Sequence, residues 1–349
     1  MGQPGFFDVE ERYGALDAMG DPLVVLKNSV PWEEFRPICA KVREKERKSP
    51  AGRKPLDPVM MVKALVLQSL YNLSDQQMEY QIKDRMSFMR FLGLDLEDTV
   101  PDATTLWSYR QALTERGLLE GLFERFTAYL SARGYQAKGG QIIDASIVAV
   151  PRQRNTREEN AAIKAGELPE GREDNPAMRR QKDTDARWTQ KHGKSSFGYK
   201  NHINVDTKHK LIRKFAVTDA ATHDSQLLAQ VLDDTNTGAS VWADSAYRSE
   251  ETEQWLSEAG FKSQIHYKGQ RGKPLSAHKK HLNRLRSTIR ARVEHVFGFQ
   301  ENSMGGKLIR TIGLARAKTK IALMNLTYNI RRYLHLERRK PRNRLAHVT

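Results

Sequence analysis

Cysteine is almost absent from this chain, since Cys39 is the one cysteine in 349 residues. A lone cysteine excludes an intrachain disulfide framework and the cysteine-rich zinc sites, and it is typical of a reducing compartment. An apolar run long enough to cross a membrane, about 18 residues, is also missing. The best candidate, "VMMVKALVLQSL", is interrupted by Lys63, and the first residues lack the basic-then-apolar order of a signal peptide. We therefore expect a cytoplasmic protein with no membrane partner.

Acidic residues are scarce in the last quarter of the chain. Residues 262–349 contain 22 Lys or Arg and three acidic residues, a net charge of +19, whereas the whole chain carries +16. The preceding part is therefore close to neutral. Positive charge placed so unevenly predicts a polyanionic partner, most simply nucleic acid, and a basic surface that only keeps the protein soluble explains it less well.

The first part of the chain has the pattern of short helices. Residues 1–31 are mixed in character, and we expect them to form a loosely ordered N-terminal arm. Residues 32–137 repeat apolar positions at helical spacing, as in "DPVMMVKALVLQSLYNLS", and Ser74 is a suitable N-cap for a further helix. These helices suit either a helix-turn-helix-like DNA-binding domain or an ordinary bundle that packs or dimerises, and the pattern favours neither.

Residues 138–338 have a different texture, with β-branched runs that predict strands. The expected strands are "QIIDASIVAV", two in "FGYKNHINVDTKHKLIRKFAVTDA", "SVWADSAY" and "FKSQIHYK". Three strands in an antiparallel meander, followed by α/β crossovers, predict an α/β fold with a mixed five-stranded sheet flanked by helices. The polar stretch 151–196 is an insertion that is either functional or disordered. Residues 339–349 form a basic tail.

Three acidic residues stand where such a sheet can bring them together. Asp144 lies within the first strand, Asp244 at the end of the fourth, and Glu294 on the helix after the fifth. Taken singly, each has a plainer explanation. Asp144 and Asp244 each suit a turn or a strand edge, and Glu294 suits an exposed ion pair with Arg290. Asp144 resists that explanation most, because apolar neighbours flank it within a strand.

A cluster of three carboxylates is stable only with compensating cations, because like charges raise one another's pKa. Hard oxygen ligands that leave open positions suit Mg²⁺ or Mn²⁺. Two such ions, about 3.5–4 Å apart, can activate a water or a 3′-hydroxyl for phosphoryl transfer. The strand pattern alone does not select the three acids, since Asp206 and Asp219 also end strands.

With these residues in view, the chain resembles a DDE transposase of a bacterial insertion sequence, in the insertion sequence five group. The resemblance spans about residues 32–336 and rests on "IIDASIVAVPRQRN", "FGYKNHINVDTKHKLIRKFAVTDAATHDSQ", "ADSAYRSEE", and "RARVEHVFG" followed by "LIRTIGLARAKTKIALMNLTYNIRR". It implies an RNase H-like catalytic core joined to a helical N-terminal DNA-binding domain. It also implies that Asp144, Asp244 and Glu294 are the catalytic, metal-binding acids.

Related transposases carry a Tyr, Arg, Glu and Lys signature around the glutamate, with spacings of two, three and six. Arg290 and Glu294 match it, whereas Ser287 and Glu301 stand at the Tyr and Lys positions. We expect Arg290, one helical turn before the glutamate, to hold a DNA phosphate. The other candidate DNA contacts are polar or basic residues near the acids or in the helical region: Arg292, Lys307, Lys200, Asn201, Thr105, Tyr109 and Arg110.

Two further positions have alternative explanations. Trp188, in the polar insertion, either stacks on an unpaired base or anchors the segment by burial. His223 and Asp224, in "ATHDSQ", either line the cleft or cap the helix that follows, and we favour the cap.

The sequence thus predicts an enzyme that binds the terminal inverted repeats of an insertion sequence, cleaves DNA at its ends and joins the 3′-hydroxyl to target DNA. The predicted cofactor is Mg²⁺ (or Mn²⁺), as two ions. The predicted partners are double-stranded DNA and further copies of the chain, in a homodimer or larger assembly at the bacterial nucleoid. Two other functions remain open: a DNA-binding regulator without catalysis, which needs none of the acids, and an RNase H-like nuclease that cuts without joining.

Overall fold

The computed structural model describes residues 8–43, 55–153, 155–167, 181–191, 193–269 and 272–340. The chain divides into two compact units, one formed by Met1–Phe126 with Asn329–Thr349 and the other by Thr127–Tyr328. The boundaries fall inside two helices, α8 (Leu118–Ala132) and α15 (Leu314–Arg339). None of the helices in the described part of the chain combines the length and the apolar character that a membrane span requires.

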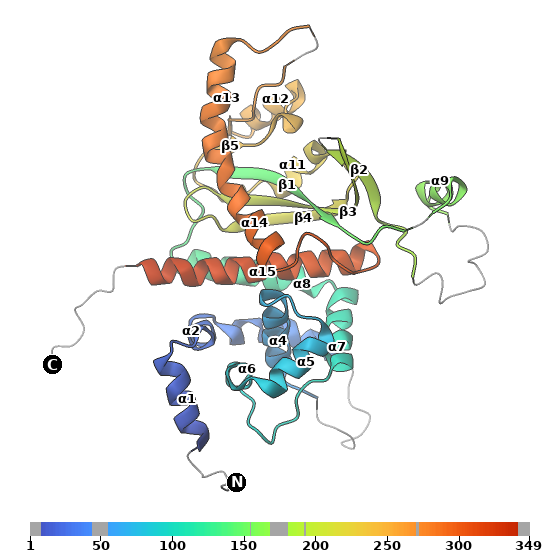
Figure 1. The fold of residues 1–349 in the computed structure, drawn as a ribbon. Coiled ribbons are helices and arrows are strands. Elements are labelled where there is room, and N and C mark those ends of the chain that lie inside the picture. Colours follow the sequence, from blue (N-terminus) through green and yellow to red (C-terminus); the bar gives the residue numbers. More distant parts are fainter. Residues whose placement is uncertain are drawn as a thin grey trace, which may run out of the picture. The chain divides into compact units, whose positions relative to one another are not determined.

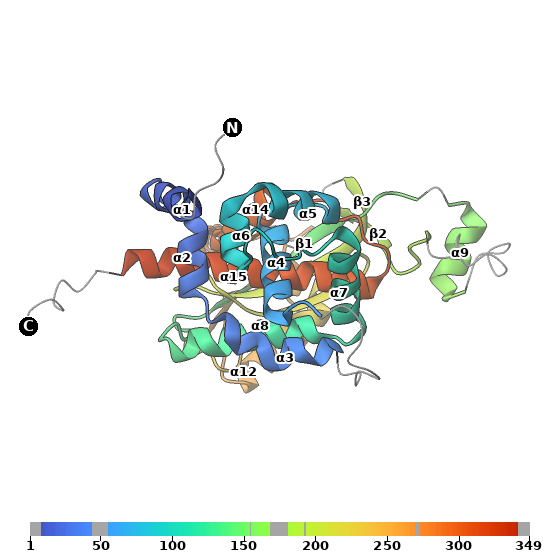
Figure 2. The ribbon, with the colours of Figure 1, turned by 90° about the horizontal axis from the view of Figure 1, so that it is seen from below.

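The described part of the first unit consists of helices. They are α1 (Asp8–Ala18), α2 (Pro22–Ser29), η1 (Trp32–Phe35), α3 (Arg36–Ala40), η2 (Lys41–Arg43), α4 (Pro58–Leu70), α5 (Asp75–Asp84), α6 (Met86–Leu92) and α7 (Ala103–Glu115). Helix α4 lies among α3, α5, α6 and α7 and is buried over most of its length (Figure 2). Asp57 caps it by accepting a hydrogen bond from the Met60 N–H at 2.9 Å, which agrees with the start predicted from "DP".

Helices α1 and α2 lie in the stretch that the sequence predicts to be a loose arm. Asp21 caps α2 by accepting a hydrogen bond from the Leu23 N–H at 2.9 Å, and Leu23 and Leu26 are buried. The difference arises because two apolar side chains in a short helix are too few to give a periodic signal, yet they suffice to pack it against a neighbour.

The second unit is built on a mixed six-stranded sheet (Figure 1). Its strands are β1 (Gln141–Ala149), β2 (Arg187–Lys191), β3 (Lys194–Asp206), β4 (Ile212–Asp219), β5 (Ser240–Trp242) and β6 (Lys262–Ser263). The order is β2-β3-β1-β5-β6, and β4 also pairs with β3. The strands β1, β2 and β4 are antiparallel to β3, whereas β5 is parallel to β1 and β6 to β5.

The predicted mixed sheet is confirmed, although it has six strands rather than five. The additional strand, β2, lies in the polar insertion, where "RWTQK" lacks the apolar alternation that would mark a strand. The same insertion contains α9 (Arg157–Ala165), and its residues 168–180 lie outside the described residues. The last two predicted strands are shorter than expected, because the chain turns soon after Trp242 and after Ser263.

Helices cover both faces of the sheet. Besides α9, the helices of this unit are η3 (Asp224–Leu227), α11 (Leu228–Val231), η4 (Ser245–Tyr247), α12 (Glu250–Glu258), α13 (Ala277–Arg290), η5 (Ala291–Val293) and α14 (Glu294–Ser303), and α15 begins here. Side chains alternate between faces along β1. Ile143 packs with Leu228 and Leu256, while Val148 packs with Ile321 of α15. Asp144, which shares a face with Val148, therefore points to the side that α15 covers.

A close backbone approach fixes where β1 begins beside β5. Gly140 precedes β1 with a φ of +95°, and a Cβ atom on it would lie 2.5 Å from the Ser240 carbonyl oxygen and 2.5 Å from the Trp242 ring. Only glycine combines this backbone conformation with this contact. The pairing of Gln141 with Val241 therefore depends on the glycine.

We expect Gly140→Ala to lower the free energy of unfolding by about 2–4 kcal/mol, because backbone strain and overpacking add. Gly134→Ala is the matched control, since Gly134 has a φ of +88° and a Cβ added to it would meet no atom within 4 Å. It should cost only about 1–2 kcal/mol. Urea unfolding of both variants measures the difference, and equal losses would contradict the role given to the contact with Ser240.

Candidate active site

Asp144 is a buried carboxylate in the middle of the sheet. It is 5% exposed, and it lies opposite Ile203 in the register of β1 and β3. Its Oδ2 accepts a hydrogen bond from Arg290 Nη1 at 2.8 Å, and its Oδ1 accepts one from the Ala145 N–H at 2.9 Å. Burial raises the pKa of Asp144 to about 6, although the Arg290 charge and the Ala145 N–H act to lower it.

Asp244 stands beside Asp144 at the end of the neighbouring strand. The parallel register pairs Gln141 with Val241 and Ile142 with Trp242, so the same offset of residues brings Asp144 level with Asp244. The negative charge of Asp244 contributes to the raised pKa of Asp144. Asp244 also caps η4, because its Oδ1 accepts a hydrogen bond from the Ala246 N–H at 2.7 Å. Asp144, within β1, and Asp244, two residues after β5 ends, are therefore close enough to interact through their charges; we refer to them as the aspartate pair.

The two competing strand-end acids are occupied by turns. Asp206 is fully buried, and its carboxylate accepts hydrogen bonds from the His209 N–H at 2.6 Å and from Arg213 Nε at 3.2 Å. Burial acts to raise the pKa of Asp206, but the His209 hydrogen bond and the Arg213 charge bring it below its ordinary value. Asp219 accepts hydrogen bonds from the Ala221 N–H at 2.8 Å and from the Thr222 hydroxyl at 2.7 Å. These bonds commit both acids to turns.

Arg290 is the last residue of α13, and it faces the aspartate pair. Its side chain is 27% exposed, and its Nε is buried without a hydrogen-bond partner among the described residues. An ion pair with a carboxylate that is removed from water is stronger than an exposed one. Arg290 therefore compensates the buried charge of Asp144, a role that the sequence spacing did not indicate.

Glu294 does not join the aspartates in this structure. It is the first residue of α14 and is exposed. Across the described residues, no group of three or more His, Cys, Asp or Glu is arranged to hold a metal ion. A different carboxylate of α14, Glu301, approaches β1, since its Oε1 accepts a hydrogen bond from the Ser146 hydroxyl at 3.3 Å. Of the three predicted acids, Asp144 and Asp244 thus interact through their charges, and Glu294 does not complete a three-acid group with them among the described residues.

Tyr247 and His266 lie near the aspartates, and the sequence did not single them out. Tyr247 is fully buried, and its hydroxyl has no hydrogen-bond partner among the described residues. Burial raises the pKa of Tyr247 well above its usual value, and Asp144 and Asp244 contribute. The His266 N–H donates to the Ala243 carbonyl at 3.2 Å. Burial and the positive charge of Arg290 lower the pKa of His266, whereas the negative charge of Asp244 acts to raise it. The tyrosine could have been noticed, because it follows Asp244 by three residues, but nothing local marks His266.

Lys200 and Asn201 are predicted as DNA contacts, and the structure corrects that expectation. They belong to β3, which has partners on both sides. Asn201 is 1% exposed and exchanges side-chain hydrogen bonds with Asn325 at 3.0 and 3.1 Å. Lys200 donates to the Thr222 carbonyl at 2.7 Å and lies 2.8 Å from Asp224 Oδ1. The polar groups of both side chains thus have partners inside the unit, as buried polar groups require.

The remaining candidates of the second unit differ in exposure. Arg292 is half-buried and donates to the Thr207 carbonyl at 3.1 Å, whereas Lys307 is exposed. Trp188 is 45% exposed and packs its ring 5.3 Å from that of Phe197, so burial anchors it only in part. His223 caps η3, as predicted, by accepting a hydrogen bond from the Ser225 N–H.

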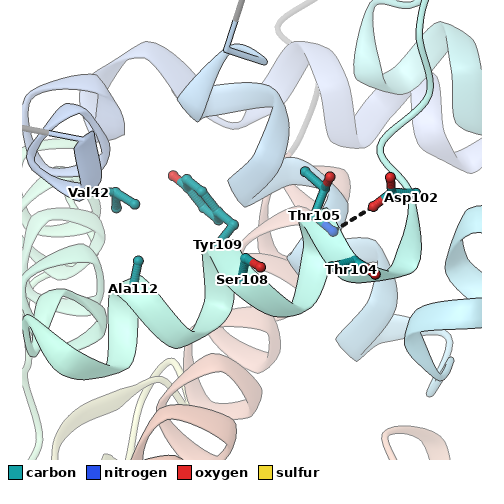
Figure 3. Close-up of a pocket in the computed structure, with 7 residues that line it drawn as sticks. All are labelled: Val42, Asp102, Thr104, Thr105, Ser108, Tyr109 and Ala112. Carbon is teal, nitrogen blue, oxygen red and sulfur yellow. Dashed lines mark hydrogen bonds between the residues drawn. The ribbon is translucent and has the colours of Figure 1, made fainter. Parts of the chain in front are cut away.

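The three candidates in the first unit lie on α7. Thr105 and Tyr109 line a pocket of about 310 Å³ together with Asp102 and Ser108 (Figure 3). The Thr105 N–H donates to the Asp102 cap at 2.6 Å. Tyr109 is 3% exposed and donates its hydroxyl hydrogen to the Pro58 carbonyl at 3.0 Å, which makes it a packing residue of α4 and α7.

Arg110, the third candidate on α7, is occupied by a carboxylate of the same unit. It forms two hydrogen bonds of 2.7 Å with the Asp75 carboxylate, and its Nη1 also donates to Gln68 Oε1 at 3.1 Å. The pair joins α7 to the start of α5. A bidentate guanidinium that is already paired offers little to a DNA phosphate. The structure thus accounts for Tyr109 and Arg110 through contacts within the unit.

Comparison with known proteins bears on both units. Residues 135–330 match the family model of the Transposase DDE domain, and residues 10–112 match that of a Transposase domain (DUF772). A cryo-EM structure of a piggyBac transposase synaptic complex with hairpin DNA is similar over 91% of this chain and 76% of that chain, with 12% identity and a TM-score of 0.44. Because the DDE match covers more than half of the sequence and includes Asp144, Asp244 and Glu294, the chain belongs to the DDE transposases.

Proposed function

We propose that the chain is the transposase of a bacterial insertion sequence, that it cleaves DNA at the ends of the element, and that it joins the 3′-hydroxyl to target DNA. The observation that carries the proposal is the aspartate pair: Asp144 lies within β1 and Asp244 directly follows the parallel neighbour β5, both inside the matched DDE domain. The sequence motifs favour the insertion sequence five group. A catalytic pair distinguishes this function from that of a DNA-binding regulator, which needs no such acids.

The strand arrangement supports an RNase H-like core. Three antiparallel strands (β4, β3 and β1) are followed by two parallel strands, β5 and β6, with helices on both faces. Asp144 lies in the first strand of that order along the chain and Asp244 directly after β5. Because β1 continues past the point where its parallel neighbour β5 ends, Asp144 within β1 and Asp244 just after β5 can be presented to one substrate.

The aspartate pair fits a hard divalent cation. DDE transposase domains generally use divalent metals, and carboxylate oxygens are ligands that Mg²⁺ and Mn²⁺ prefer. The raised pKa of Asp144 fits too, because a nearby cation would offset the charge that burial penalises. Asp144 and Asp244 would hold the metal, with Glu294 as third ligand on the strength of the family match. Two Mg²⁺ (or Mn²⁺) ions would supply activation of the attacking oxygen and stabilisation of the leaving one.

The other residues of the site would bind and orient DNA. Arg290 faces the pair from α13, and its fixed guanidinium fork suits a phosphate beside the reacting bond. The exposed Lys307 would hold the backbone further along. We assign binding of the terminal repeats to the helical first unit, and pairing of the two DNA ends to a dimer or larger assembly. The remaining exposed part of Thr105 is available to DNA in this assignment.

We expect Asp144→Asn to abolish Mg²⁺-dependent cleavage of a terminal-repeat duplex, because the amide removes the ligand charge but keeps the shape. Binding of the same duplex in EDTA should stay within about threefold of the wild-type value, since specific binding depends on other contacts. Cleavage assays and electrophoretic mobility shifts measure the two quantities. Cleavage retained by this variant would exclude the assignment.

Glu294→Gln should likewise abolish cleavage, although Glu294 is exposed in this structure. Glu301→Gln is the matched control, because it changes the other carboxylate of α14, the one beside Ser146, and should retain cleavage. The same assay under identical Mg²⁺ reads both variants. Loss of cleavage in Glu301→Gln with retention in Glu294→Gln would identify Glu301 as the third acid instead.

The raised pKa of Asp144 predicts a pH dependence of stability in the metal-free chain. Because the folded state holds this proton more tightly than the unfolded state, stability should fall as the pH rises from about 4 through about 6, by up to about 3 kcal/mol. The buried His202, whose pKa is lowered to about 4, acts in the opposite direction over the same range. The difference between wild type and Asp144→Asn cancels the His202 contribution.

Urea unfolding at several pH values, in EDTA, measures that difference. The wild type should lose stability relative to Asp144→Asn between pH values of about 4 and 7. A difference that does not change with pH would show that the Asp144 carboxyl is not held protonated by burial.

A further inference from the structure

Three cations surround one aromatic ring in the second unit. The guanidinium carbons of Arg248 and Arg286 lie 4.3 and 4.5 Å from the centroid of the Tyr267 ring, and Lys279 Nζ lies 5.3 Å from it. Each contact is a favourable cation–π interaction. Three positive charges on one ring also repel one another, so the arrangement needs further support.

Hydrogen bonds hold the ring and two of the cations in place. The Asn283 side chain accepts from the Tyr267 N–H at 2.8 Å and donates to the Tyr267 carbonyl at 3.0 Å, which pins the tyrosine to α13. Arg248 Nη1 and Arg286 Nη1 both donate to the Ile265 carbonyl oxygen, at 2.7 and 2.6 Å. Two guanidinium groups that share one acceptor are rigidly placed and leave other N–H groups for a ligand.

The charge of this cluster is not balanced within the described residues. Arg248 Nη2 lies 3.2 Å from Glu253 Oε2, whereas neither Arg286 nor Lys279 has an ion pair there. Lys279 is exposed, and Arg248 keeps 22% of its side chain exposed. Helix α13, which carries Lys279 and Arg286, contains no buried residue. An anion from outside the unit can therefore reach the cluster.

The cluster lies close to the aspartate pair. His266 directly precedes Tyr267, and its N–H bonds to the Ala243 carbonyl, next to Asp244. The His266 ring nitrogen Nε2 lies 3.3 Å from the hydroxyl of Ser287, on the same helix as Arg286. A DNA strand bound at Asp244 could thus continue past the Tyr267 ring. Figure 1 shows α13 running beside β5 in the direction of α14.

We infer that Arg248, Lys279 and Arg286, gathered on the Tyr267 ring, form a binding site for a backbone phosphate of the DNA strand held at the aspartate pair. This inference rests on the proposed function, and it adds a second anchoring point to the one at Arg290. A phosphate supplies the negative charge that the cluster lacks. Guanidinium groups bind phosphate oxygens through paired hydrogen bonds, and a cation held on an aromatic ring is already partly desolvated.

The test is the salt dependence of binding to a short mixed-sequence DNA duplex in EDTA, so that no cleavage intervenes. The double variant Arg248→Gln, Lys279→Gln should reduce the slope of log K against log salt by about 1–2. Its affinity at about 100 mM salt should fall roughly tenfold or more. Lys279→Gln alone, which changes an exposed side chain and leaves the fold intact, should reduce the slope by about 1.

The control is the double variant Lys208→Gln, Lys214→Gln, which removes the same charge from the β3–β4 side of the unit. This control should change the slope of log K against log salt by less than half the change expected for the Arg248→Gln, Lys279→Gln variant. Equal effects in the two double variants would overturn the site in favour of general electrostatic attraction. If the wild-type chain binds DNA and the Arg248 and Lys279 variants bind it with the same salt dependence, the proposed phosphate site is overturned and the proposed function is not. Failure of the wild-type chain to bind DNA would contradict the site and the proposed function together.

Discussion

The buried carboxylate of Asp144 is the constraint on which the second unit depends. A charge in the middle of a sheet is costly unless a partner compensates it, and here the partner comes from the end of α13, 146 residues further along the chain. The pair ties β1 to α13 and therefore determines where α14, with Glu294, must begin. Removing one partner would leave the other buried without compensation, which is more costly than never having placed the pair there.

The register of β1 and β5 is the second constraint on the site. The parallel pairing of Gln141 with Val241 and of Ile142 with Trp242 directs the chain after β5 toward Asp144, and Gly140 makes the close approach of the two strands possible. Burial, the Arg290 ion pair and the neighbouring Asp244 then act on one carboxyl group in opposing directions, with the result that its pKa lies at about 6. A group balanced in this way responds strongly to any cation that arrives, and this suits a metal ligand better than a purely structural acid.

Polar side chains elsewhere in the sheet have the opposite role. Asn201, Asn325 and Gln300 satisfy one another across the interior, and Lys200 is neutralised by Asp224. Such buried networks add specificity of packing when every member has a partner. Exposed positive charge lies instead on α13, where no residue is buried, and at other positions such as Lys307. Basic composition alone therefore does not identify the positive charges that are exposed.

Local sequence determined much of this protein. The β-branched run of β1, the caps Asp57 and Ser74, and the basic last quarter could all be predicted, because propensity, capping and charge act between near neighbours. The mixed sheet was predicted from the strand pattern, and the family from the resemblance of the longer motifs. Sequence did not reveal β2, whose pairing with β3 comes from tertiary contact, or which polar residues are buried.

Only the tertiary structure decided which charged and polar side chains are buried and which residues they contact. It joined Asp144 to Arg290 and Asp244, left Glu294 at the surface, and turned Tyr109, Arg110, Lys200 and Asn201 inward. The physical reason is common to all of these cases. Whether a charged or polar group is buried, paired or free depends on side chains that are distant in the sequence, and its energy depends on the water that those side chains remove.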